Sequence, residues 1–154
     1  MIDFLRKNVL IIYVGLLSII HTACNYAGGT LGASDGVEFP HSSDKINEGL
    51  DSLFSKYSEY QVPEKWHDLD NWSKRGMDYL NGRVLYFRES PEEMYFLTAS
   101  SDTINGVGKT AIFIRAVSNG DTWINFADLS DTERRRMEDR FDKEVIPKIR
   151  NFLK

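Results

Sequence analysis

The amino-acid sequence predicts an α+β fold, in which a four-stranded antiparallel β meander is flanked by an N-terminal and a C-terminal helix. Three features predict this fold. Apolar residues recur at helical spacing after Ser43, the apolar period changes to two after Arg83, and a helix-capping sequence begins at Ser130. The chain of 154 residues has the length of one domain, which we place at residues 43–154.

The first 23 residues have the three parts of a secretory signal peptide. Arg6 and Lys7 make the start positive, and residues 9–20 form an uncharged apolar run. A membrane-spanning helix needs about 20 apolar residues, so this run is too short to be one. The sequence therefore predicts an exported protein.

Residues 20–24, Ile-His-Thr-Ala-Cys, resemble the lipobox of bacterial lipoproteins. The resemblance implies that the sulfur of Cys24 carries a lipid such as palmitate, and that the chain is cut directly before this residue. The small residues before the cysteine fit the family pattern, whereas His21 stands where the family usually has Leu. Two alternatives remain open, an ordinary signal peptide cut after Gly29 and an uncleaved anchor. Cys24 is the single cysteine of the sequence, and lipid attachment explains a thiol that no disulfide within the chain can use.

Residues 24–42 are rich in Gly, Ser and Ala, and we interpret them as a flexible tether between the lipid and the domain. Without residues 1–23 the chain has 17 Lys and Arg against 22 Asp and Glu, which is a net charge of −5. This charge disfavours a general attraction to nucleic acid or to anionic lipid. We expect a domain in the periplasm or at the cell surface that is tethered to the cell membrane or outer membrane and binds no nucleic acid.

Two amphipathic helices are predicted at the ends of the domain. In the first, capped by Ser42 or Ser43, apolar residues recur at helical spacing over residues 46–57, and the helix ends before Pro63. The last helix begins at the capping box of residues 130–133. Pro147 removes a hydrogen bond within this helix, so we expect a kink or a break near Lys143.

Four strands are predicted between the helices. A turn with Pro91 at its second position joins the first two strands, and residues 101–108 form a loop between the second and third. Asn119 and Gly120 mark a tight hairpin before the fourth strand, because both residues tolerate positive φ. Residues 64–82 are predicted to be irregular with one helical stretch. The predicted strands are residues 83–89, 94–100, 110–117 and 122–126.

The first three predicted strands present apolar residues on both faces, for example Tyr86 on one and Phe87 on the other. An antiparallel sheet with one solvated face would alternate between apolar and polar residues. Two helices cover one face, so something else must cover the second. Either residues 60–80 cover it with Trp66 and Trp72, or a partner protein, a second copy of the chain or an apolar ligand does. In the second case the two tryptophans would form the partner-binding surface.

The candidate motifs do not identify a catalytic residue, a metal site or a cofactor. Residues 107–110 (VGKT) resemble the end of a phosphate-binding loop, but Thr103 replaces the required glycine and a strand follows. His67 precedes Asp68, yet no nucleophile or metal partner is evident for it. After the signal peptide the chain has one further histidine, so we expect no metal site of histidines and cysteines.

The runs of like charge are interpreted as solvated surface. Glu92, Glu93 and the acidic residues of the last helix offer carboxylates, but a pair for glycoside hydrolysis must face each other across a cleft. The run Arg134, Arg135 and Arg136 is balanced by neighbouring acids, which indicates a solvated helix start and not a nucleic-acid contact.

The stretch from Arg83 to Ile149, with PEEMY followed by AIFIRAV, is similar to small lipoproteins of the Bacteroidota. This resemblance implies a shared fold and supplies no activity. We predict a non-enzymatic, membrane-tethered binding or accessory lipoprotein of the cell envelope. The alternatives are an immunity protein or inhibitor that captures a toxin or hydrolase, and a hydrolase of envelope glycans or peptides.

Overall fold

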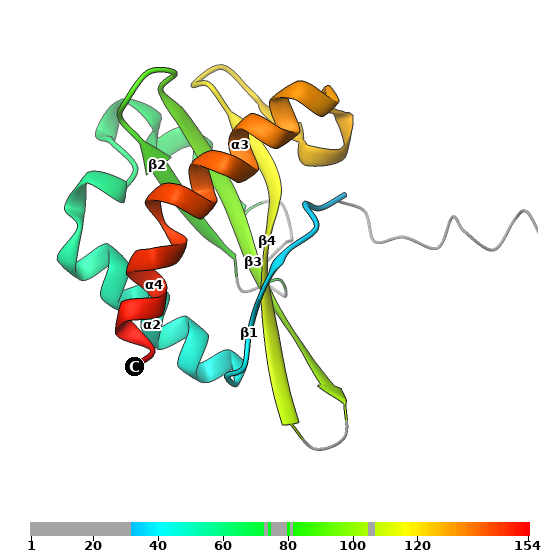
Figure 1. The fold of residues 1–154 in the computed structure, drawn as a ribbon. Helices are drawn as coiled ribbons and strands as arrows, with labels where there is room; N and C mark the ends of the chain where they lie inside the picture. Colours follow the sequence, from blue (N-terminus) through cyan, green and yellow to red (C-terminus); the bar gives the residue numbers. More distant parts are fainter. Residues whose placement is uncertain (1–31, 73, 75–79, 81, 105–106) are drawn as a thin grey trace, which may run out of the picture. The chain divides into compact units, whose positions relative to one another are not determined.

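The computed structural model describes residues 32–154 except residues 73, 75–79, 81 and 105–106 (Figure 1). The predicted signal peptide and Cys24 therefore lie outside the described residues. The strands are β1 (Val37–Phe39), β2 (Arg83–Phe87), β3 (Glu93–Ile104), β4 (Val107–Ser118) and β5 (Trp123–Asn125). The α-helices are α2 (Ser43–Lys56), α3 (Asp131–Glu144) and α4 (Ile146–Phe152), and the 3-10 helices are η1 (Ser58–Tyr60), η2 (Glu64–Leu69) and η5 (Phe126–Asp128).

The five strands of the described residues form one antiparallel sheet, which confirms the α+β fold with helices at both ends. β2, β3, β4 and β5 follow one another as the predicted meander. β1 was not predicted. It pairs with residues 110–112 of β4, while β5 pairs with residues 116–118, so both short strands share the β4 edge that β3 leaves open.

The folded unit begins earlier than the sequence predicted. Part of the expected tether, Val37–Phe39, pairs with β4, and the Phe39 side chain is buried. Upstream of β1, the backbone N–H of Ser34 donates to the carbonyl of Ile114 at 3.0 Å, and the Ser34 hydroxyl accepts from the Ile114 N–H at 2.9 Å. The predicted tether boundary at residue 42 is therefore wrong. Backbone pairing with a sheet edge does not require apolar side chains, so the composition of this segment did not indicate the pairing.

The hairpin of β3 and β4 is longer than predicted. Residues 101–108 were expected to be a loop, but β3 continues to Ile104 and β4 begins at Val107. Figure 1 shows this hairpin extending past the other strands. Few of the residues between Thr98 and Lys109 are apolar, so the period of two that marks the earlier strands is absent there.

Helices α2, α3 and α4 cover one face of the sheet (Figure 1). α3 ends at Glu144 and α4 begins at Ile146, with Pro147 in its first turn, which confirms the predicted break. Proline is tolerated there because the first N–H groups of a helix have no partner within it. The buried side chains of this core include Phe39, Ile46, Leu53, Leu85, Tyr95, Leu97, Ile112, Phe126, Phe141 and Ile149.

The second face is covered, in the region of Trp72, by the chain itself. The Trp72 ring stacks on Phe96 with centroids 3.9 Å apart and lies edge-on to Trp123 at 5.0 Å. Trp72 is 7% exposed, and Leu80 and Val84 pack against the same cluster. Of the two interpretations of the sequence, the structure supports cover by residues 60–80 at this position.

Glu93 ties α3 to the start of β3. Its buried carboxylate accepts hydrogen bonds from Arg136, from Tyr95 at 3.1 Å and from Arg140 at 3.4 Å. Arg140 also donates to two carbonyls of the turn between β2 and β3, at 2.7 and 2.9 Å. A buried carboxylate that accepts several charge-assisted bonds has a fixed geometry, so this network determines where the helix lies on the sheet.

Candidate functional site

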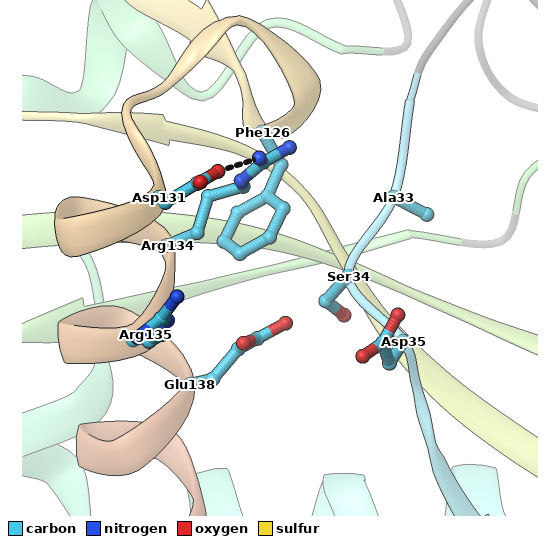
Figure 2. A pocket seen from close by; sticks show the side chains of 8 residues that line it. All are labelled: Ala33, Ser34, Asp35, Phe126, Asp131, Arg134, Arg135 and Glu138. Atoms are coloured by element: carbon cyan, nitrogen blue, oxygen red, sulfur yellow. Dashed lines mark hydrogen bonds and ion pairs between the residues drawn. The ribbon is translucent and has the colours of Figure 1, made fainter.

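A pocket of about 380 Å³ lies between residues 33–35 and the first two turns of α3 (Figure 2). Its volume is within the range of small-molecule sites. The ring of Phe126 is buried beneath it, and two arginines and three carboxylates supply its charges. The lining residues are Ala33, Ser34, Asp35, Phe126, Asp131, Arg134, Arg135 and Glu138.

The wall formed by residues 33–35 is held against the sheet. Two hydrogen bonds join Ser34 to Ile114 of β4, as described above. Gly32 lies so close to Ala127 that a Cβ at Gly32 would overlap the alanine side chain. This wall is therefore positioned by contacts at Ser34 and at Gly32.

The opposite wall is the start of α3. The Ser130 hydroxyl accepts from the N–H of Glu133 at 3.3 Å and donates to the Glu133 carboxylate at 3.0 Å, so the predicted cap of this helix is confirmed. The buried Glu93 holds the following turn through Arg136. Both walls are thus positioned by contacts outside the pocket, and a ligand would meet a largely preformed site.

The charged side chains of the pocket differ in what they bind. Arg134 is paired with Asp131, and this hydrogen bond holds the pKa of the Asp131 carboxyl below its usual value. Arg135, Glu138 and Asp35 have no hydrogen bond or ion pair to any other described side chain. Figure 2 shows Glu138 pointing from α3 toward Ser34 and Asp35. The pocket therefore presents an uncommitted guanidinium and two uncommitted carboxylates.

This pocket was not predicted from the sequence. Arg134, Arg135 and Arg136 were interpreted as one solvated run, but Arg136 binds the buried Glu93 and the other two line the pocket. Successive helical residues point about 100° apart, so three arginines in a row meet three different environments. The run of arginines was visible in the sequence, but residues 33–35, which form the other wall of the pocket, carry no pattern that indicates a site.

The interpretation of Glu93 as solvated charge was wrong. Glu93 is 5% exposed and bound by two arginines, because the turn after β2 brings it under α3. Glu92 lies nearer the surface, where it accepts from Tyr86 and from Lys65 at 2.6 Å. These two hydrogen bonds hold the pKa of the Glu92 carboxyl below its usual value, and the bond from Lys65 has the larger effect.

The two predicted partner-binding residues lie in different surroundings. Trp72 is buried in the second face of the sheet. Trp66 is half-buried, with its ring edge-on to Tyr86 at 5.5 Å and the Lys65 ammonium 4.7 Å from its centroid. It also packs on Gly120 of the β4–β5 hairpin. The structure therefore leaves Trp66 partly accessible and Trp72 inaccessible.

His67 is exposed and lines a second, more open pocket of about 400 Å³. Its Nε2 lies 3.0 Å from the carbonyl of Val62 and donates to it. Asp70, and not the adjacent Asp68, lines this pocket with His67. Burial raises the pKa of the Asp70 carboxyl, while the nearby His67 acts in the opposite direction. Among the described residues, no group of three His, Cys, Asp or Glu side chains is arranged to hold a metal ion.

The comparisons with known proteins found no match, so any functional argument rests on the geometry of the pocket. No family model matches the chain, and neither a curated protein nor a solved structure matches it. Over the described ranges, no helix is long and apolar enough to cross a membrane.

Proposed function

We propose that this chain is a lipid-anchored, non-enzymatic binding lipoprotein of the cell envelope, with its domain in the periplasm or at the cell surface. The observation that carries the proposal is the order of features along the chain. A signal-like segment ends at Cys24, and Ser34, ten residues later, is hydrogen-bonded to the sheet of a folded unit with a charged pocket. A lipid on Cys24 would hold that unit at the membrane surface.

The pocket between residues 33–35 and α3 is the binding site of this proposal. Its walls are positioned in advance, and its uncommitted charges can bind a ligand without breaking an internal ion pair. Bound ligand groups would replace water around Arg135 and Glu138, and charge-assisted hydrogen bonds of this kind are stronger than those between neutral groups.

The test of the anchor is a Cys24→Ser variant. We expect this variant to appear in the soluble fraction and to stop incorporating radiolabelled palmitate, because serine offers no thiol for the lipid. The matched control is His21→Leu, which brings the segment closer to the lipobox pattern and should keep both the label and the membrane location. A serine variant that stays in the membrane as an intact precursor would show that the segment is an uncleaved anchor.

A further inference from the structure

We propose that the pocket at the start of α3 binds a zwitterion that joins a primary ammonium to a phosphate, and that its source is the phosphoethanolamine headgroup of the membrane that anchors the chain. The choice of source rests on the proposed function, because it needs the lipid on Cys24. The ligand chemistry rests on the lining residues alone.

The two ends of such a zwitterion match the uncommitted charges. Arg135 presents guanidinium N–H groups that suit a phosphate, and no carboxylate among the described residues is bound to them. Glu138 and Asp35 come from opposite walls of the pocket, and Figure 2 shows the Glu138 carboxylate directed toward Asp35. An ammonium between these two carboxylates would donate up to three charge-assisted hydrogen bonds, one from each of its protons.

Neither a simple anion nor a simple cation fits the lining as well. An anion alone would meet the uncommitted carboxylates, and a cation alone would leave Arg135 without a counter-charge, whereas a zwitterion meets opposite charge at both ends. The net charge of −5 for residues 24–154 disfavours anionic lipid in general. A headgroup with no net charge avoids this repulsion.

The length of the chain before the pocket favours a membrane source. Ala33 lines the pocket and is nine residues after Cys24. Because a chain spans at most about 3.6 Å per residue, a lipid on Cys24 lies no further than about 32 Å from Ala33 in any conformation. This limit is close to the diameter of about 35 Å expected for a domain of this size. Headgroups of the same membrane would therefore be present at high effective concentration.

The ligand chemistry is tested by calorimetry on the full chain as isolated from membranes in detergent. O-phosphoethanolamine should bind at least about tenfold more tightly than inorganic phosphate or ethanolamine alone, because only the joined molecule reaches both ends of the pocket. Arg135→Gln and Glu138→Gln should each weaken its binding by about tenfold or more, a typical loss for one charge-assisted contact. Asp139→Asn is the matched control, since Asp139 is exposed on α3 and pairs with Lys143 outside the pocket.

The source is tested with the same protein in nanodiscs. Replacing phosphatidylcholine by phosphatidylethanolamine should raise the melting temperature of the wild type and leave that of Glu138→Gln unchanged, because a quaternary ammonium has no proton to donate to Glu138. Replacement by phosphatidylglycerol should not raise it.

Each outcome bears on a different part of the proposal. If O-phosphoethanolamine does not bind, or binds equally to both pocket variants, the ligand chemistry is overturned whether or not Cys24 is lipidated. If it binds but phosphatidylethanolamine has no effect, the membrane source is overturned and the ligand is a soluble zwitterion. A failure of palmitate labelling removes the anchor and leaves the calorimetric result standing.

Discussion

Three consecutive arginines of α3 illustrate how one residue type takes three roles. Arg134 pairs with an acid on its own helix, Arg135 lines the pocket with no ion pair to another described side chain, and Arg136 binds the buried Glu93. The hydrogen bond to Glu93 raises the pKa of the Arg136 guanidinium. Helical geometry separates the three side chains, so their roles follow from what the sheet and the N-terminal segment place around them.

At the same scale, the two tryptophans are predicted to differ in their contribution to stability. Trp72→Ala should lower the free energy of unfolding by about 3–5 kcal/mol, because it removes a buried ring that stacks on Phe96. Trp66→Ala should cost clearly less, since that ring is half-exposed. Urea unfolding of the two variants beside the wild type measures both values. Equal losses for the two variants would contradict the assignment of Trp72 alone to the core.

The buried Tyr95 predicts how stability changes at alkaline pH. Burial, with a smaller contribution from the neighbouring Glu93, raises the pKa of the Tyr95 hydroxyl above its usual value of 10.0. Above about pH 10 the unfolded chain therefore releases a proton that the folded chain retains, and the free energy of unfolding falls as pH rises further. Below that pH both states hold the proton, so this contribution is fully present.

Unfolding measured in urea between pH 8 and 11 tests this behaviour. Tyr95→Phe should have a shallower decline than the wild type, because it removes the proton that distinguishes the two states. Tyr57→Phe is the comparison, since Tyr57 is only half-buried. An unchanged slope in Tyr95→Phe would show that another group causes the alkaline loss.

At the scale of elements, the β4–β5 hairpin combines a local rule with a tertiary contact. Asn119 and Gly120 predicted a tight hairpin, and Gly120 has a φ of 103°, which side chains rarely tolerate. The structure adds that the Trp66 ring lies directly on this glycine, so that a Cβ there would overlap the ring. The turn therefore also positions η2 on the second face of the sheet.

Gly120→Ala is predicted to be destabilising for both reasons. We expect a loss of roughly 1–3 kcal/mol, the scale of a strained backbone position, with more if the Trp66 ring is displaced. In a Trp66→Ala background the same change should cost less, because only the backbone strain remains. A double-mutant cycle by urea unfolding measures the difference. Additive losses would show that Trp66 and Gly120 are not coupled.

At the scale of the whole molecule, the position of the first folded residue has a measurable consequence. A chain that begins at residue 43 lacks β1, the buried Phe39 and the bonds between Ser34 and Ile114. Losing the Phe39 side chain alone should cost about 3–5 kcal/mol, and the exposed β4 edge would favour aggregation. A chain that begins at residue 32 keeps all these contacts.

Urea unfolding of the two shortened chains tests this boundary. The chain from residue 32 should match the chain from residue 25 in its free energy of unfolding, and the chain from residue 43 should be markedly less stable. If all three are equally stable, residues 32–42 are a tether, as their composition suggested.

Much of the architecture follows from local patterns in the sequence. Several of these elements were predicted from the sequence: the helix before the sheet, the helical segment after it with its N-cap at Ser130 and its break before Pro147, and the meander of β2 to β5. They could be predicted because helix caps, proline geometry and apolar periodicity act over a few neighbouring residues. The signal-like segment and Cys24 were also identified this way, and the anchor stays a prediction.

The features that only the tertiary structure determined depend on contacts between residues far apart in the chain. β1, the burial of Glu93 and the pocket between residues 33–35 and α3 depend on partners about 40 to 100 positions away in sequence. No local pattern encodes such a distance, since the same Gly-rich or charged segment would be solvated without the sheet edge or helix that meets it. The pocket exists because the N-terminal segment and α3 meet at one end of the sheet, each held by its own contacts.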